Sequence, residues 1–255
     1  MPLRLLITTI FFLWPFTRSQ ATTYAVVVGI ADYQNMTYSN GDLHFADRDA
    51  ARMAAFLQSK IGGNVPPQHI IQLTNEQATK RAIVQAMQKL FVQANSHDKV
   101  LLYFSGHGVT EAFVPYDVIL SDFKTLLTHQ EVKAIFKISK AQTKICIADA
   151  CMSGSMKRPH FKTALMTKEN TTNVAMMLSS RASQKSVEAT RIDGGVFTHF
   201  WLKGLNGEAD ANRNKIVTIR ELYVYLSPNI KKYTPHHQAP VFVGKFSNEM
   251  ILSNL

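Results

Sequence analysis

The sequence predicts an α/β domain in which helices cover both faces of a mostly parallel sheet. The first observation is a set of nearly continuous apolar runs at 24–30, 99–104 and 143–148, which is how strands buried on both faces of a parallel sheet read. The second is that segments with helical periodicity separate these runs, so that strands and helices alternate along the chain.

The other elements fit the same alternation. A threonine followed three residues later by a glutamate forms a capping box, and such pairs open predicted helices at Thr128 and Thr218. We expect helices over 47–60, 79–93 and 128–138, around 197–205, and from 218 onward. We expect further strands over 69–73, 174–178 and 241–243.

Length and composition indicate one globular domain that follows a targeting segment. The 255 residues are 46% hydrophobic, and no repeat, low-complexity tract or Pro/Gly-rich linker divides them. Residues 1–21 have the pattern of a secretory signal peptide, with a basic start at Arg4, an apolar run over 5–16 and a small-x-small cleavage site at 19–21. We therefore expect a single domain over 22–255.

This pattern predicts a location outside the cytoplasm, either secreted or periplasmic. An uncleaved anchor is the alternative, but Pro15 and Arg18 cut the apolar stretch short. No later segment approaches the roughly 18 uninterrupted apolar residues that a membrane helix needs. We expect no transmembrane segment once the signal peptide has been removed.

The chain is basic, with 28 Lys and Arg against 18 Asp and Glu and a formal net charge of +10. Such a surface can associate with nucleic acid or with an anionic envelope surface. The basic residues are dispersed among helices and loops and form no basic stripe, which favours an ordinary solvated surface. We therefore expect no specific nucleic-acid partner, whereas an anionic envelope surface stays open as a partner.

Two glycine-flanked motifs follow two of the apolar runs, Tyr-Phe-Ser-Gly-His-Gly at 103–108 and Asp-Ala-Cys-Met-Ser-Gly at 149–154. Parallel strands present their carboxyl ends at one edge of a sheet, where open α/β folds place their active sites. His107 could there take the proton of the Cys151 thiol, which makes the thiol a nucleophile. The N–H groups of Gly108 and Cys151 could hold the oxyanion of a tetrahedral intermediate.

Cys146 and Cys151 are the only cysteines of the chain. If both lie on one extended segment, their Cα atoms are about 16 Å apart, well beyond the roughly 7 Å limit for a disulfide. We expect Cys146 to be a small core residue and Cys151 to be a free thiol.

The His-Gly and Ala-Cys motifs, in this order, resemble the caspase-like clan of cysteine peptidases, which includes caspases and metacaspases. Ser-Gly-His-Gly together with Asp-Ala-Cys-x-Ser-Gly is similar to its bacterial metacaspase (orthocaspase) members, and the likeness extends from 24–30 to 194–198. Met152 stands where many metacaspases have His. The resemblance implies a three-layer α/β/α sandwich with a mostly parallel sheet of about six strands, and a Cys–His dyad.

Asp149 bears on the substrate, because residues two apart on a strand face the same side and Asp149 could therefore share the cleft with Cys151. A carboxylate there would attract an Arg or Lys side chain and repel an acidic one. The resemblance to metacaspases implies that Asp149 and Asp49 together form the pocket for a P1 Arg or Lys. Two structural alternatives stay open: Asp149 accepts a strand-end backbone hydrogen bond, and Asp49 is a first-turn helix charge.

These observations predict a cysteine endopeptidase that hydrolyses protein or peptide substrates after Arg or Lys. One alternative is a caspase-like peptidase with a different P1 specificity, such as Asp. Another is a noncatalytic interaction protein that retains the caspase-like fold. The loops expected to surround the substrate cleft are 40–45 and 179–194.

No metal or cofactor is expected. Acidic and amide residues between 210 and 221 have the spacing of a calcium loop, but Lys215 replaces the glycine that such a loop needs. An Asx-rich turn that leads into the capped helix at Thr218 is the simpler interpretation. Some metacaspases require calcium through other acidic surfaces, so that calcium dependence stays open.

Overall fold

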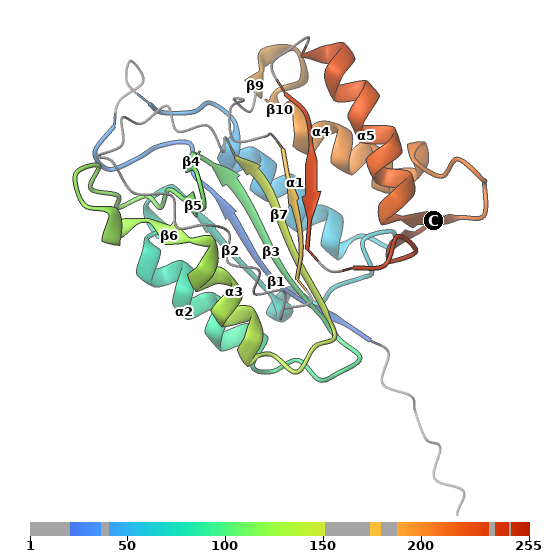
Figure 1. The fold of residues 1–255 in the computed structure, drawn as a ribbon, viewed down its shortest axis with the longest axis horizontal. Helices are drawn as coiled ribbons and strands as arrows, with labels where there is room; N and C mark the ends of the chain where they lie inside the picture. The colour runs from blue at the N-terminus through green and yellow to red at the C-terminus, as the bar shows by residue number, and fades with distance from the viewer. Residues whose placement is uncertain (1–20, 37–40, 151–173, 180–187, 235–237, 245) are drawn as a thin grey trace, which may run out of the picture.

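The computed structural model describes residues 21–36, 41–150, 174–179, 188–234, 238–244 and 246–255. Its main feature is a six-stranded sheet in the order β12-β8-β7-β3-β1-β2 (Figure 1). Neighbouring strands are parallel except β12, which is antiparallel to β8. The strands are β1 (Thr23–Gly29), β2 (Ile70–Thr74), β3 (Lys99–Gly106), β7 (Thr143–Ala150), β8 (Val174–Leu178) and β12 (Val241–Val243).

Helices cover both faces of this sheet and make three layers (Figure 1). On one face lie α2 (Lys80–Phe91) and α3 (His129–Ile138), and on the other lie α1 (Ala46–Gln58), α4 (Val196–Lys203) and α5 (Ile219–Tyr233). Alternate residues of each central strand enter two separate cores: Leu102 and Phe104 pack on the first face, Leu101 and Tyr103 on the second. Burial on both faces explains the continuous apolar runs and confirms the predicted α/β sandwich.

The predicted strands and helices are confirmed to within a few residues at their ends. Thr128 Oγ1 accepts a hydrogen bond from the N–H of Glu131 at 3.1 Å, and Glu131 Oε2 accepts one from the N–H of Thr128 at 2.8 Å. The same reciprocal pair forms between Thr218 and Glu221. The capping boxes therefore begin α3 and α5 at the predicted residues.

Three small sheets were not predicted, because strands of two to four residues carry no recognisable periodicity. They are β4–β5–β6 (Gly108–Val109, Ala112–Phe113, Leu127–Thr128), β9–β10 (Glu188–Ala189, Gly194–Gly195) and β11–β13 (Ile216–Thr218, Ile251–Asn254). Short helical turns occupy Pro67–His69, Asn75–Gln77, Phe123–Thr125 and Thr190–Ile192, and a π turn, Gly204–Glu208, continues α4.

The segment with calcium-loop spacing is a turn closed by hydrogen bonds from backbone N–H groups to side-chain oxygens. Asp210 accepts hydrogen bonds from the N–H groups of Asn214 at 3.1 Å and Lys215 at 2.9 Å, and Asn214 Oδ1 accepts one from Ile216 at 2.9 Å. These bonds confirm the Asx-turn interpretation. Among the described residues, no group of three His, Cys, Asp or Glu side chains is arranged to hold a metal ion.

Cys146 lies on β7 inside the core and has no exposed surface. Burial raises the pKa of its thiol to about 12, so that it is protonated at neutral pH. This confirms Cys146 as a core residue. The predicted signal peptide lies almost entirely outside the described residues and stays a prediction; within the described part, no helix is long and apolar enough to cross a membrane.

Candidate active site

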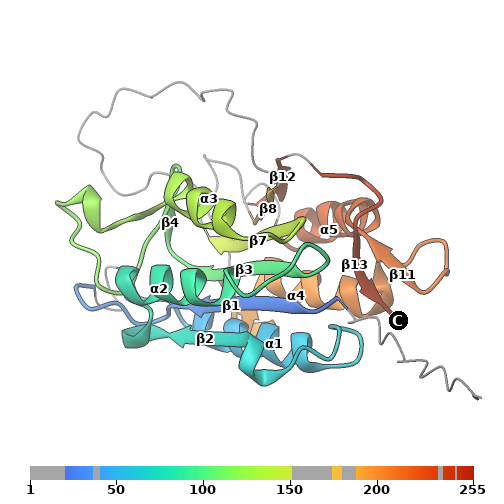
Figure 2. The same cartoon turned by 90° about the horizontal axis from the view of Figure 1, so that it is seen from below.

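The strand β3 lies at the centre of the main sheet (Figure 2). His107 directly follows its carboxyl end. The register between β3 and β7 pairs Ser105 with Asp149 and Gly106 with Ala150. Cys151, the residue after Ala150, lies outside the described residues. The register therefore brings the strand that leads to Cys151 directly beside the strand that leads to His107.

Two contacts orient His107. Its backbone N–H donates a hydrogen bond to the hydroxyl oxygen of Tyr33 at 2.7 Å, and the two rings lie 5.1 Å apart between centroids. Its ring Nε2 contacts the carbonyl oxygen of Gly41. Because a carbonyl oxygen only accepts, Nε2 carries the ring proton and Nδ1 carries the lone pair that can receive a proton.

Gly106 makes the Tyr33 contact possible. A Cβ atom at this position would lie 2.8 Å from the Tyr33 hydroxyl oxygen and 3.1 Å from a ring carbon of Phe104. Any larger residue would push Tyr33 away from the backbone of His107. The first glycine of the Ser-Gly-His-Gly motif is thus required by the packing around the histidine.

The structure brings Asp49 and Asp149 together, although they are far apart in the sequence. Asp49 lies in the first turn of α1, and its Oδ2 accepts a hydrogen bond from the N–H of Gly195 at 2.7 Å. Asp149 Oδ2 accepts bonds from the N–H and hydroxyl of Thr198 at 3.0 and 2.8 Å. A Cβ atom on Gly195 would overlap Asp149 Oδ2 and lie 2.8 Å from Asp49 Oδ2, so that both carboxylates converge on this glycine.

Both carboxylates are buried, with exposed fractions of 1% for Asp49 and 5% for Asp149. Asp49 does lie in the first turn of α1, as its structural alternative proposed, and it is buried there. Asp149 does accept a backbone hydrogen bond, as its alternative proposed, but the donor is Thr198 of α4. Their role toward a substrate stays a prediction.

The negative field of this pair acts on Tyr103, which lies on β3 beneath it. Burial raises the pKa of Tyr103 well above its usual value, and the nearby charges of Asp49 and Asp149 raise it further. The Tyr103 hydroxyl is 2.6 Å from the Thr198 hydroxyl, which itself donates to Asp149. Tyr103 therefore stays uncharged and holds Thr198, which binds Asp149, without changing the charge of the two carboxylates.

Two arginines of α1 border the acidic pair. Arg52 Nη1 lies 3.4 Å from Asp49 Oδ1, and its Nη2 lies 3.3 Å from Asp193. Arg48 contacts Asp193 at 2.5 Å. Arg52 therefore contacts both Asp49 and the exposed Asp193, whereas Arg48 forms its ion pair with Asp193.

The loops that were expected around the cleft contribute on both sides. Gly41 of the first loop, 40–45, contacts His107. Gly194, the last residue of the second loop, 179–194, and the next residue, Gly195, contact the acidic pair. Gly108 is buried on β4 opposite Phe113, and its predicted role at an oxyanion is not tested by this position. Sequence patterns carried no signal for Tyr33, Thr198 or Arg52.

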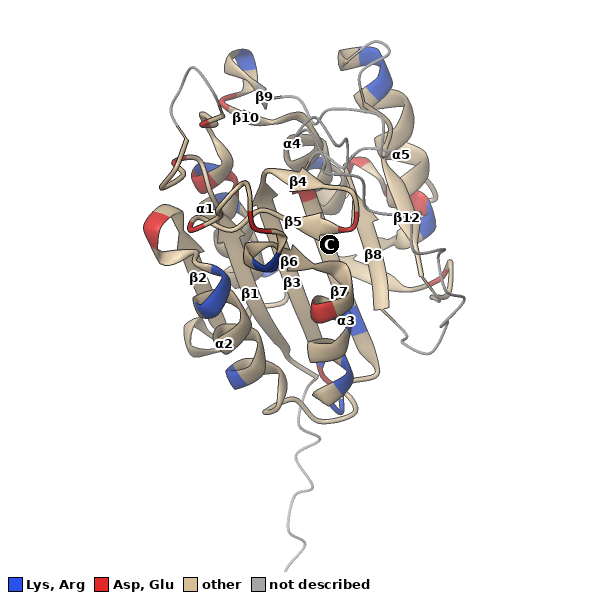
Figure 3. Cartoon of the chain, turned by 60° about the vertical axis from the view of Figure 1, so that its left-hand side comes forward, with Lys and Arg blue, Asp and Glu red and all other residues tan. Residues whose placement is uncertain are grey.

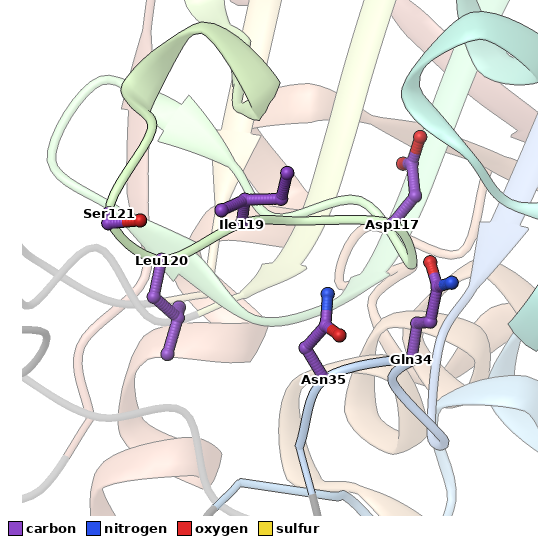
Figure 4. A pocket seen from close by; sticks show the side chains of 6 residues that line it. All are labelled: Gln34, Asn35, Asp117, Ile119, Leu120 and Ser121. Carbon is purple, nitrogen blue, oxygen red and sulfur yellow. The ribbon is translucent and has the colours of Figure 1, made fainter.

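An open hollow of about 570 Å³ lies beside the loop that follows β1 (Figure 4). The Asn35 side-chain amide donates to the carbonyl of Val118 at 2.9 Å and ties its two walls together. Among the described residues that line this hollow, His107, Asp49 and Asp149 are absent. Its lining residues are Gln34, Asn35, Asp117, Ile119, Leu120 and Ser121.

Comparison with known proteins identifies the family of this chain. Residues 22–249 match the caspase domain family, and the chain therefore belongs to that family, whose members are cysteine peptidases. Caspase-1 from Spodoptera frugiperda has a similar structure, with a TM-score of 0.65, 12% identity, and coverage of 92% of this chain and 91% of that chain.

A crystal structure of a protein from Geobacter sulfurreducens is similar with a TM-score of 0.62 and 17% identity, covering 87% of this chain and 92% of that chain. At these identities the two likenesses concern the fold. A search of curated proteins gives no significant match.

The Tyr33 contact makes a testable prediction. Tyr33→Phe removes the acceptor of the His107 N–H, and a hydrogen bond of this kind contributes about 1 kcal/mol. We expect kcat for peptide hydrolysis to fall about fivefold to tenfold with little change in KM. Tyr225→Phe is the matched control, because it removes a tyrosine–carboxylate bond to Glu208 away from the site. An equal loss in both variants would mean that Tyr33 contributes only general stability.

Proposed function

We propose that this protein is a metacaspase-type cysteine endopeptidase that hydrolyses peptide bonds after Arg or Lys. The observation that supports this specificity most strongly is the convergence of two buried carboxylates, Asp49 and Asp149, on Gly195 beside the strand that leads to Cys151. A pocket that already holds two negative charges favours a cationic P1 side chain and disfavours Asp.

In the proposed mechanism, the Cys151 thiolate attacks the scissile carbonyl carbon and forms a tetrahedral intermediate. His107 Nδ1 takes the thiol proton and then delivers it to the leaving amine. Its Nε2 proton, held by the Gly41 carbonyl, keeps the ring in the required tautomer. The N–H groups of Gly108 and Cys151 hold the oxyanion, and water then hydrolyses the acyl-enzyme.

A P1 arginine can make charge-assisted hydrogen bonds to carboxylates in a bidentate geometry, whereas lysine acts as a point charge.

The proposed location is secreted or periplasmic, after removal of residues 1–21. Amino-terminal sequencing of the exported protein tests this part, because a mature chain that begins at residue 22 is expected.

The central experiment is a panel of fluorogenic peptides that differ only at P1, assayed with and without calcium. Arg and Lys substrates are expected to be cleaved, and neutral and Asp substrates much less. Preference for P1 Asp would overturn the specificity, and no hydrolysis of any peptide would favour the noncatalytic alternative. The calcium arm decides the metal dependence that the sequence left open.

Thiol labelling separates an enzyme from a noncatalytic binding protein. At pH 7.5 the Cys146 thiol, with a pKa of about 12, is protonated and buried, so that native labelling by iodoacetamide should reach Cys151 alone. Because His107 accepts its proton, Cys151 should react faster than a model thiol, and His107→Ala should abolish the excess rate. Peptide mapping by mass spectrometry measures both. A Cys151 rate equal to that of the model thiol would contradict the proposed dyad.

The two arginines of α1 offer a matched pair of variants. Arg52→Gln removes a cation that contacts Asp49, whereas Arg48→Gln removes one that contacts Asp193 and the Phe45 ring. We expect Arg52→Gln to raise kcat/KM for basic P1 substrates about fivefold, because a partly exposed ion pair contributes up to about 1 kcal/mol. Arg48→Gln should leave kcat/KM within about twofold. Equal effects of the two would assign both arginines to the exposed ion-pair network alone.

A further inference from the structure

Three segments contact one another at the end of the main sheet where its central strands begin, which is the end opposite the candidate active site. The ends of α2 and α3 lie side by side, with the rings of Phe91 and Phe136 stacked at 5.1 Å. The loops after them are joined by a hydrogen bond from the N–H of Gln142 to the carbonyl of Ser96 at 3.3 Å. We call the surface formed by residues 88–99 and 136–144 the basic edge.

The start of β1 belongs to the same edge. The N–H of Thr22 donates to Asp98 Oδ1 at 2.9 Å, and the carbonyl of Thr22 accepts from the N–H of Lys99 at 2.8 Å. The proposed mature chain begins at residue 22, so that its amino terminus lies at the basic edge.

The charge of this edge is one-sided. Lys89, Lys137 and Lys140 are exposed, and Figure 3 shows basic residues, in blue, at the lower ends of α2 and α3. Lys99 and Lys144, also in these segments, direct their ammonium groups to backbone carbonyls. The one acidic residue of the two segments is Asp98. Its side chain is 2% exposed and accepts hydrogen bonds from the N–H groups of Thr22 and Asn95.

Two large apolar side chains stand among these lysines. Val92, directly after α2, is 62% exposed, and Ile138, the last residue of α3, is 51% exposed. Lys89 lies one turn before Val92, and Lys137 and Lys140 flank Ile138. Exposed aliphatic side chains surrounded by lysines are suited to the boundary between anionic headgroups and acyl chains.

We propose that the basic edge docks on a bilayer surface that contains anionic phospholipids. Lys89, Lys137 and Lys140 contact the headgroups, and Val92 and Ile138 enter the boundary below them. His107 lies at the opposite edge, so that docking leaves the candidate active site facing away from the membrane. This inference does not depend on peptidase activity.

Vesicle flotation of the full chain tests the proposal, with phosphatidylglycerol–phosphatidylcholine vesicles compared with pure phosphatidylcholine. The variant Lys89→Gln/Lys137→Gln/Lys140→Gln should lose about 100-fold in the anionic preference, since each lysine near such a surface contributes about fivefold. The control, Lys124→Gln/Lys231→Gln/Lys232→Gln, makes the same change in net charge at exposed sites elsewhere. Equal losses in both variants would overturn the proposal in favour of net charge alone.

The apolar contribution is tested in the same assay. Val92→Ser/Ile138→Ser should weaken binding to anionic vesicles about tenfold. Val224→Ser/Ile119→Ser is closely matched, because these side chains are 63% and 50% exposed away from the basic edge. No difference between the two pairs would exclude insertion of Val92 and Ile138.

Hydrogen exchange locates the contact within the domain, and this readout is independent of any contribution of residues 1–21 to vesicle binding. Amides of 92–98 and 138–143 should exchange more slowly when anionic vesicles are added, while amides near His107 should not change. Unchanged exchange at the basic edge in vesicle-bound protein would overturn the proposal. Peptide hydrolysis by the lysine variants should remain at the wild-type rate, so that failure here and failure of the proposed function are distinguishable.

Discussion

Cys151→Ala is expected to abolish peptide hydrolysis, and His107→Ala is expected to lower it at least about 100-fold. The alanine at 151 removes the atom that attacks the carbonyl, whereas the alanine at 107 leaves a thiol that is mostly protonated at neutral pH. Steady-state hydrolysis of the best peptide of the P1 panel measures both. Undiminished hydrolysis by folded Cys151→Ala protein would reject the assignment of the nucleophile.

Cys146→Ala is the control for this prediction. It also removes a thiol from β7, but from a position with no exposed surface and with a pKa raised to about 12 by burial. We expect it to retain hydrolysis while lowering the melting temperature slightly. Thermal unfolding of all three variants separates loss of chemistry from loss of fold.

Asp149→Asn should lower kcat/KM for Arg and Lys substrates by about one to two decades relative to neutral substrates. The substitution removes the charge but keeps an oxygen that can accept the Thr198 bonds. A charge-assisted contact of this kind contributes about 1.5–3 kcal/mol. Selectivity is measured as the ratio of kcat/KM for P1 Arg to that for P1 Gln.

Asp49 and Asp47 provide the matched comparison, because both lie in the first turn of α1 and only Asp49 contacts Gly195. Asp49→Asn should reduce the Arg-to-Gln ratio, and Asp47→Asn should leave it unchanged. If both substitutions act alike, Asp49 contributes as a helix charge and not as a pocket residue.

The sequence predicted the main sheet well because its central strands are buried on both faces, which makes them apolar throughout. The threonine–glutamate capping boxes at Thr128 and Thr218 are local and were equally recognisable. His107 and Asp149 were predicted as site residues because they lie at the ends of such strands, in motifs with glycines, and the structure places both at these strand ends. The two-residue strands around Gly108 and Gly195 escaped prediction, since their pairing depends on partners elsewhere in the chain.

The burial of Asp49 could not be predicted from its neighbours in the sequence. Its sequence context, Asp-Arg-Asp in a helix start, fits a surface charge equally well, and only the resemblance to metacaspases pointed to a pocket. Its burial and its bond to Gly195 arise from tertiary contacts that no periodicity encodes. The same holds for Arg52 and Tyr33, whose partners lie on other elements.

The bond between Asp49 and Gly195 closes a loop of 146 residues, whereas β3 and β7 pair across a shorter span. Long loops close late in folding, because the chain loses more entropy before the contact is rewarded. A partly folded chain could thus hold its central strands while its two carboxylates are still apart. In the proposed peptidase, this order of assembly would delay formation of the P1 pocket until the whole domain has folded.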